Sequence, residues 1–98
     1  MKKFNPIRTR QFDENLRAVI AYIKAESPQN ASAFLEGVLQ AVDNIALFPS
    51  KAVEVGPNIR VKYFKGYWLP YHIRGDDIFI LDILHPRQDT AARKYRED

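Results

Sequence analysis

The hydrophobic pattern of this chain changes its period once, near residue 50, and this change limits the fold more than any other feature. Before that point apolar residues recur at the spacing of one helix face, and after it they alternate, as they do in a strand. The chain has 98 residues, enough for one modest core and too few for a second. Helices followed by strands around one core predict an α+β fold in a single domain, residues 1–98.

Two helices are predicted in the first half. The first begins at Gln11 and ends near Ala25, and Ser27 then caps a second helix with Pro28 at its first position, where the missing N–H costs nothing. Pro49 ends the second helix. The core-facing positions are Phe12, Leu16, Val19, Ile20 and Ile23 in the first helix, and Ala31, Phe34 or Leu35, Val38, Val42 and Ile45 in the second. The short connection predicts an antiparallel helical hairpin.

Strands are predicted in the second half, at residues 59–64, 68–74 and 77–84. The last is apolar at nearly every position, which is typical of a strand that is covered on both faces or lies at the centre of the sheet, and we predict a central strand beneath the helices. Residues 3–9, which contain Pro6, predict a short edge strand. The two faces of residues 59–64 differ, with Ile59, Val61 and Tyr63 on one and Arg60, Lys62 and Phe64 on the other. We therefore expect an N-terminal strand and a helical hairpin packed on a small antiparallel sheet of three to four strands.

Three further features of the strands and the tail carry predictions. Pro70 cannot donate to a strand ladder, so it is predicted to mark a bulge or an edge position. His72 lies within a strand and is expected to be partly buried and hydrogen-bonded. Residues 89–98 are strongly charged, which predicts a short surface helix or a flexible tail.

Composition narrows the classes of function. The chain has no cysteine and two histidines, so neither a structural metal centre nor a cofactor is expected. No apolar run approaches the length of a membrane span, and the N-terminal lysines are not followed by an apolar segment, so we expect a cytoplasmic protein with no membrane partner. A net charge of +3 is compatible with an acidic partner.

The order of strand, two helices and three strands resembles the RelE/ParE superfamily, the toxins of bacterial toxin–antitoxin operons. The resemblance spans residues 10–89. It is carried by "NLRAVIAYIKAESPQNASAF", similar to the family's junction of two helices at Ser-Pro, by "LFPSKAVEVGPNIRVKYF", similar to its Phe-Pro loop and Arg-bearing strand, and by "GYWLPYHIRGDDIFILDILHPRQD", similar to its ending in His-x-x-Arg.

RelE-like members cut messenger RNA on the ribosome, and for that reaction the resemblance implies a catalytic set. Cleavage beside a 2′-OH needs a group that takes its proton and cations that hold the phosphate. If the chain is a nuclease, the candidates for these roles are Arg60, Lys62, His85 and Arg87. Alternating Arg and Lys on a strand is, however, most often the solvated face of a half-buried sheet. The set also departs from the family's nucleases, because Trp68 stands where they carry an arginine and Tyr95 is out of register with their terminal tyrosine.

ParE-like members bind and poison DNA gyrase. The chain resembles them more closely in its Phe-Pro loop and in its ending, where His85-Pro86-Arg87 is similar to the family's His-x-x-Arg but has one residue fewer between the histidine and the arginine. Such a toxin needs a binding surface rather than a catalytic set, and aromatic and arginine side chains are the usual anchors of such surfaces. The candidates for binding the target or the antitoxin are Arg60, Phe64, Trp68, Arg87, Arg93, Lys94 and Arg96.

The expected function is therefore that of a ParE-like toxin of a type II toxin–antitoxin system, which inhibits DNA gyrase and is neutralised by a cognate antitoxin. Two alternatives stay open: a RelE-like endoribonuclease that acts on the ribosome and its mRNA, and a non-toxic module that only binds the antitoxin. The resemblance implies either a homodimer or a toxin–antitoxin hetero-oligomer.

Overall fold

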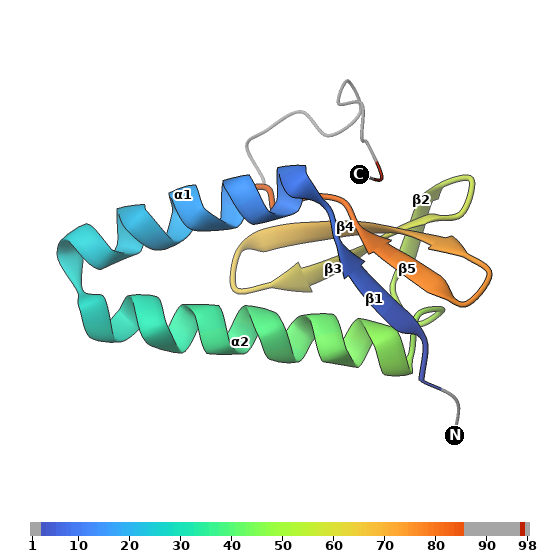
Figure 1. Ribbon diagram of the computed structural model, residues 1–98, viewed down its shortest axis with the longest axis horizontal. Helices are drawn as coiled ribbons and strands as arrows, with labels where there is room; N and C mark the ends of the chain where they lie inside the picture. The colour runs from blue at the N-terminus through green and yellow to red at the C-terminus, as the bar shows by residue number, and fades with distance from the viewer. Residues whose placement is uncertain (1–2, 86–96, 98) are drawn as a thin grey trace.

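The computed structural model describes residues 3–85 and 97, and in these residues it contains two helices and five strands (Figure 1). In chain order they are β1 (Asn5–Arg8), α1 (Arg10–Glu26), α2 (Pro28–Leu47), β2 (Val53–Gly56), β3 (Ile59–Phe64), β4 (Tyr67–Arg74) and β5 (Asp77–Ile80). The prediction of an α+β fold with an N-terminal strand and a helical hairpin is confirmed.

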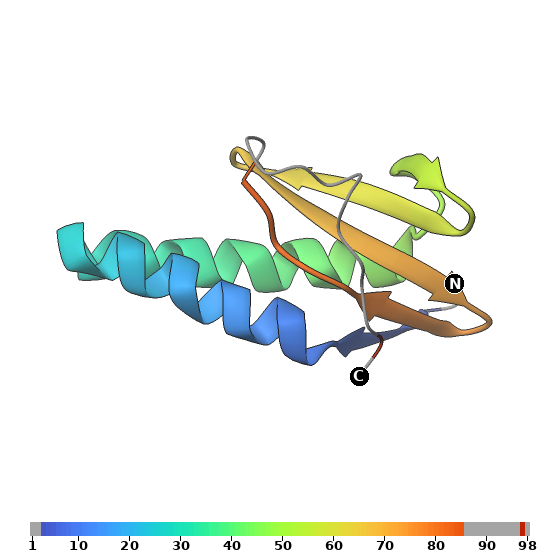
Figure 2. The ribbon, with the colours of Figure 1, turned by 90° about the horizontal axis from the view of Figure 1, so that it is seen from above.

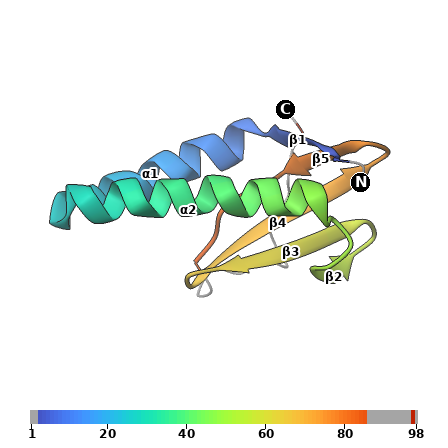
Figure 3. The ribbon, with the colours of Figure 1, turned by 90° about the horizontal axis from the view of Figure 1, so that it is seen from below.

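The helical hairpin begins and turns at two hydroxyl caps. Thr9 Oγ1 accepts a hydrogen bond from the N–H of Phe12 at 3.3 Å, and Ser27 Oγ accepts one from Asn30 at 3.2 Å. Ser27 ends α1 and caps α2 at once, with Pro28 following as predicted. Figures 1 and 3 show the two helices running side by side and reaching beyond the strands at their connection.

The five strands form one sheet in the order β1-β5-β4-β3-β2 (Figure 2). Strand β1 pairs with β5 in parallel, and β5, β4, β3 and β2 pair with one another in antiparallel fashion. The expectation of an antiparallel sheet of three to four strands was therefore wrong, because β2 adds a fifth strand and β1 makes the sheet mixed. The prediction that residues 77–84 form the central strand was wrong in two respects: β4 is central, and β5 ends at Ile80. The physical reason is that β5 has a neighbouring strand on each side, β1 and β4, and packs under the helices. It can therefore be apolar throughout although it is the second strand of the sheet and not the middle one.

Strand β2 was not located from the sequence, because residues 48–58 have the prolines and glycine of a loop. In the structure Val53 pairs with Val61 and Glu54 with Arg60, and the register shifts between Glu54 and Gly56. A short edge strand with such an irregularity is a common way to limit unwanted pairing at a sheet edge.

Pro70 marks a bulge, as predicted, although the extra residue lies in the segment that faces it. The pairs Tyr71–Ile80 and Trp68–Leu84 are separated by three residues on β4 and by four on the opposite segment. The carbonyl of Pro70 accepts a hydrogen bond from Leu81 at 2.9 Å, but Pro70 has no N–H to return. Pro70, which has no N–H to donate, thus lies beside the point where the regular pairing of β4 with β5 stops.

The core lies between the helical hairpin and one face of the sheet. Phe34 is 6% exposed and Leu35 is 36% exposed, so Phe34 is the residue that α2 contributes at this position. The sheet contributes Leu69, Tyr71, Ile78 and Ile80, and the helices contribute Phe12, Leu16, Phe34, Val38, Val42 and Ile45. Side chains alternate along a strand, so the neighbours of these sheet residues point to the opposite side. That side, the open face, carries Val53, Val55, Ile59, Val61, Tyr63, Trp68, Pro70, His72, Arg74 and Phe79.

Two buried polar side chains fasten α1 to the end of β5. Thr9 Oγ1 donates to the carbonyl of Ile80 at 2.8 Å. The carboxylate of Asp82, which is fully buried, accepts hydrogen bonds from the side-chain amides of Gln11 and Asn15 at 2.7 and 2.5 Å and from the N–H of Ile83 at 2.7 Å. With its oxygens hydrogen-bonded in this way, the buried carboxyl group fixes the position of the helix without leaving unsatisfied acceptors.

We predict that Asp82→Ala lowers the free energy of unfolding by about 2–4 kcal/mol, because two amides and one backbone N–H lose a buried acceptor. Urea denaturation followed by circular dichroism measures this loss. Asp43→Ala is the matched control, since the Asp43 side chain is 65% exposed, and it should stay within about 0.5 kcal/mol of the parent. Equal effects of the two substitutions would show that the Asp82 network contributes nothing to stability.

A second prediction concerns the contact between α2 and β3. A Cβ added at Gly37 would lie 2.5 Å from Cζ of Phe64. Gly37→Ala should therefore lower the unfolding free energy by about 1–3 kcal/mol, since overpacking outweighs the helix-propensity gain of about 1 kcal/mol. Adding Phe64→Leu should recover part of the loss. A Gly37→Ala variant as stable as the parent would contradict this close packing.

Candidate functional site

The basic side chains of β3 lie on the helix side of the sheet, and its apolar side chains lie on the open face. Arg60 pairs with Tyr71 and Lys62 with Leu69, and both partners belong to the core. Because directly paired residues share a face, Arg60 and Lys62 point toward the helices. The expectation that alternating Arg and Lys mark a solvated sheet face was therefore wrong for this strand.

Arg60 holds the loop after α2. Its Nη1 donates to the carbonyls of Ser50 and Ala52 at 3.1 and 2.6 Å, and its Nη2 lies 3.5 Å from a carboxylate oxygen of Glu54. The Arg60 side chain is 23% exposed. These contacts orient the guanidinium toward the protein's own backbone, which is the role of a structural arginine.

Lys62 and Phe64 continue along the same side of β3. Nζ of Lys62 donates to Oδ1 of Asn44 in α2 at 3.3 Å. The ring of Phe64 lies 5.6 Å from that of Phe34, between centroids, and packs beneath Gly37. Phe64 is thus part of the packing between α2 and β3.

Tyr71 is fully buried beside Arg60, and its hydroxyl donates to the carbonyl of Pro49 at 2.5 Å. Burial raises the pKa of the Tyr71 hydroxyl above its ordinary value of 10.0, and the nearby charge of Arg60 opposes that rise. The group is therefore held in its neutral form as a hydrogen-bond donor at neutral pH.

His85 lies beside the start of β4, whereas Arg60 on β3 is paired with Tyr71, farther along β4. Its exposed ring stands edge-on to Tyr67, with 5.8 Å between ring centroids and 86° between planes. Arg60 is paired with Tyr71, four residues from Tyr67, which is about 13 Å along a strand. The structure thus does not gather Arg60 and His85. Arg87, the fourth member of the proposed nuclease set, lies outside the described residues.

The open face carries an apolar groove, defined here by Val53, Val55, Val61, Tyr63 and Trp68. It has a volume of about 280 Å³. Val53, Val55 and Tyr63 are 71%, 59% and 62% exposed, which is unusual for such side chains gathered on one face. Trp68 pairs with Tyr63, so two aromatic rings lie at one end of the groove. Of the predicted binding residues within the described part of the chain, Trp68 is the one on this face.

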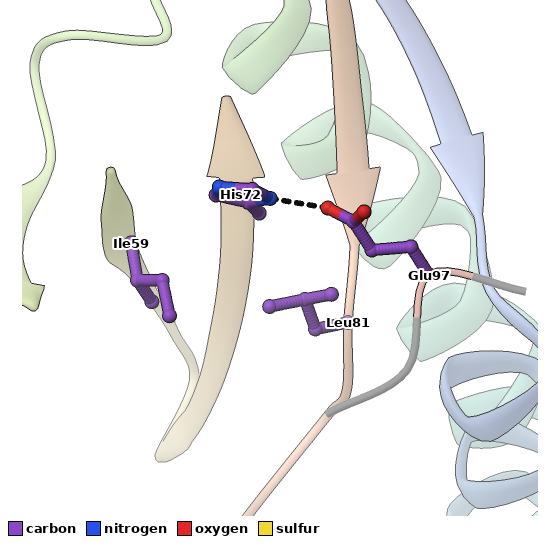
Figure 4. Close-up of a pocket in the computed structure, with 4 residues that line it drawn as sticks. All are labelled: Ile59, His72, Leu81 and Glu97. Atoms are coloured by element: carbon purple, nitrogen blue, oxygen red, sulfur yellow. Dashed lines mark hydrogen bonds and ion pairs between the residues drawn. The ribbon is translucent and has the colours of Figure 1, made fainter. Parts of the chain in front are cut away.

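A carboxylate clasp lies farther along the open face, formed by His72 and Arg74 around Glu97. Figure 4 shows the contact between His72 and Glu97, with Ile59 and Leu81 beside it. Oε1 of Glu97 lies 2.7 Å from Nη2 of Arg74, and Oε2 is hydrogen-bonded to Nδ1 of His72. Ile59 and Leu81 complete the lining of this pocket, which has a volume of about 330 Å³. The expectation of a partly buried, hydrogen-bonded His72 is confirmed, since its side chain is 24% exposed.

Sequence analysis did not identify several residues of the groove and the clasp. Some residues that it did predict lie outside the described part of the chain. Val53 and Val55 alternate with Glu54, a period of two that could have indicated β2. No sequence signal pairs His72 with Glu97. Arg93, Lys94 and Arg96, predicted to bind a target or antitoxin, lie outside the described residues.

Residues 3–85 and 97 contain no group of three or more His, Asp or Glu side chains placed to hold a metal ion. In the same residues no helix is long and apolar enough to cross a membrane.

Comparisons with known proteins agree with the fold. A family model described as the ParE toxin of a type II toxin–antitoxin system, parDE, matches residues 7–90. A solved structure titled "Chromosomal ParDE TA system from P. aeruginosa" is similar, with a TM-score of 0.72 over 85% of this chain and 96% of that chain. At 18% sequence identity this likeness concerns the fold alone. No curated protein sequence matches the chain.

The buried hydroxyl of Tyr71 predicts a dependence of stability on alkaline pH. The unfolded chain loses this proton near pH 10, whereas the folded chain, with its raised pKa, retains it to higher pH. The unfolded state therefore binds fewer protons above pH 10, and the unfolding free energy should fall by up to about 1.4 kcal/mol per pH unit from this group.

Denaturation of the parent and of Tyr71→Phe at pH 9 to 11 would measure this effect. Tyr71→Phe should be less stable at neutral pH, because the carbonyl of Pro49 loses its donor, but its stability should decline less steeply above pH 10. Parallel curves for the two proteins would contradict the assignment.

Proposed function

The chain belongs to the ParE toxin family of type II toxin–antitoxin systems, and we propose that as such a toxin it inhibits DNA gyrase by binding it through the open face of the sheet. A cognate antitoxin neutralises it, and the site of action is the bacterial cytoplasm. The toxin works through contact, so the open face needs anchors and shape rather than a nucleophile or a metal.

The apolar groove is the single observation that favours this mode of action. Tyr63 and Trp68 stand on a face that the helices leave uncovered, next to two exposed valines of β2. Aromatic side chains with apolar neighbours are the residues on which protein–protein affinity usually depends. A contiguous apolar patch of this kind on a small basic protein favours a protein partner.

The placement of Arg60, Lys62 and His85 supports binding over RNA cleavage. The two cations are engaged by Ser50, Ala52 and Asn44 on the helix side. His85 lies against Tyr67, which is four residues, about 13 Å along β4, from Tyr71, the partner of Arg60. General acid–base catalysis needs its groups within hydrogen-bond reach of one reacting centre. To serve a phosphate, Arg60 would have to release the loop that it holds.

We predict that Tyr63→Ala and Trp68→Ala each weaken inhibition of gyrase supercoiling by roughly 10- to 100-fold, the usual effect of truncating an aromatic anchor. The assay uses purified toxin and a bacterial DNA gyrase, and scores both supercoiling and accumulated cleaved DNA. Tyr22→Ala is the matched control, because Tyr22 is 71% exposed on α1, away from the open face. It should inhibit as the parent does.

Three results would count against the proposal. Equal potency of the Tyr63, Trp68 and Tyr22 variants would place the gyrase contact elsewhere. Cleaved messenger RNA on toxin-treated ribosomes, with normal supercoiling, would favour the endoribonuclease. Normal growth of cells that produce the toxin without antitoxin would favour a non-toxic binding module.

A further inference from the structure

Strand β2 contributes part of the apolar groove but is weakly fixed by its own side chains. Val53 and Val55 line the groove and are 71% and 59% exposed. The strand has four residues, lies at the edge of the sheet, and shifts its register between Glu54 and Gly56. A short edge strand that buries so little apolar surface gains little stability from burial. The position of the two valines therefore depends on other contacts that hold this segment.

Arg60 supplies such contacts from the helix side of the sheet. Its Nη1 donates to the carbonyls of Ser50 and Ala52, just before β2, at 3.1 and 2.6 Å. Its Nη2 lies 3.5 Å from a carboxylate oxygen of Glu54, the residue that Arg60 also pairs with in the sheet. A planar guanidinium holds several acceptors in one fixed arrangement, which a lysine cannot reproduce. Three contacts from one side chain thus fasten residues 50–54 to β3.

Arg60 itself lies outside the groove. Its side chain points toward the helices, whereas that of Val61, next along β3, points to the open face and lines the groove. Val61 is paired with Val53 of β2, one position from the pair of Arg60 with Glu54. The separation of β2 from β3 in the groove is therefore fixed beside Arg60. Replacing Arg60 would change the shape of the groove without removing any of the side chains that line it.

We propose that Arg60 is a positioning residue for the inhibition of gyrase: it fixes β2 from the helix side so that Val53 and Val55 complete the groove. This inference rests on the proposed function, because it takes the groove as the surface that contacts gyrase. Arg60 then determines the shape of the site without touching the target. Loss of its hydrogen bonds leaves the aromatic anchors on β3 and β4 in place but lets β2 move away from them.

Two substitutions of Arg60 grade the effect. Arg60→Met removes the donors but keeps an apolar stem of similar length, so it should release β2 with little loss of packing. It should weaken inhibition of gyrase supercoiling by roughly tenfold, as expected when hydrogen bonds from a charged group are lost. Arg60→Lys keeps a charge and a donor but lacks the planar fork, and it should weaken inhibition by only about 2- to 3-fold.

Trp68, the one tryptophan of the chain, reports on the groove in the absence of gyrase. In Arg60→Met its emission should move to longer wavelength and be quenched more readily by acrylamide, while the far-UV circular dichroism stays that of the parent. Two controls should leave both the emission and the inhibition unchanged. Arg8→Met removes an ion-paired arginine from the opposite edge strand, and Ile20→Ala lowers stability through the core contact of α1.

A double-mutant cycle separates positioning from direct contact with gyrase. Val53→Ala with Val55→Ala truncates the side chains that Arg60 is proposed to place. In that background Arg60→Met should weaken inhibition by less than about twofold more, because the changes act through the same wall of the groove. Fully additive losses would show that Arg60 acts independently of β2 and would overturn the inference.

Failure of this inference is distinguishable from failure of the proposed function. Unchanged Trp68 emission and unchanged inhibition in Arg60→Met, with Tyr63→Ala still impaired, would refute the positioning role and leave the groove as the gyrase contact. Equal losses of inhibition in Arg60→Met and Ile20→Ala would assign the effect to general stability. Cleavage of messenger RNA that is lost in Arg60→Met would make Arg60 a catalytic residue instead. Full potency of Tyr63→Ala and Trp68→Ala would refute the proposed function, and this inference with it.

Discussion

The helical hairpin covers one face of the sheet, and this constraint determines which strand side chains are buried against the helices and which lie on the open face. On β4 and β5 the covered row is apolar, and Leu69, Tyr71, Ile78 and Ile80 join the core. On β3, nearer the edge, the covered row is Arg60, Lys62 and Phe64. Long cationic side chains suit such an edge because their apolar stems lie along the core while their charged ends reach polar acceptors. The acceptors here are Asn44 and the carbonyls of Ser50 and Ala52.

The open face follows from the same constraint. Once the cations of β3 are on the helix side, the alternation of the strand leaves Ile59, Val61 and Tyr63 uncovered. Strand β2 extends that surface with Val53 and Val55 rather than shielding it. The apolar open face therefore results from the same alternation that directs Arg60 toward the loop after α2.

Sequence reasoning located the helices and most strands but could not decide which face of β3 is covered. The helix caps at Ser27 and Pro28 are local signals, and local signals were sufficient there. Alternation along residues 59–64 separates two faces but does not show which face contacts the helices. From the sequence alone, the apolar row would be expected to face them. The answer depends on the pairing of Arg60 with buried Tyr71, a contact between strands that no short window of sequence contains.

The candidate site was predictable to the extent that single residues carry their own chemistry. Trp68 was predicted from its residue type to bind a partner, and it lies on the open face, while His72 was expected to be hydrogen-bonded and is. The clasp was not predictable, because it joins residues that lie 25 positions apart in the sequence. Nor was the structural role of Arg60, since a guanidinium on a strand serves a phosphate or a backbone carbonyl equally well until its surroundings are known.

The apolar groove and the carboxylate clasp lie on one face of the sheet but depend on different interactions. The groove is lined by Tyr63, Trp68 and three valines, so it can contribute affinity through apolar contact. The clasp holds a carboxylate between the side chains of His72 and Arg74, so it depends on charge and hydrogen bonding. Under the proposed function, inhibition of gyrase depends on Tyr63 and Trp68, and the groove and the clasp can therefore be changed separately.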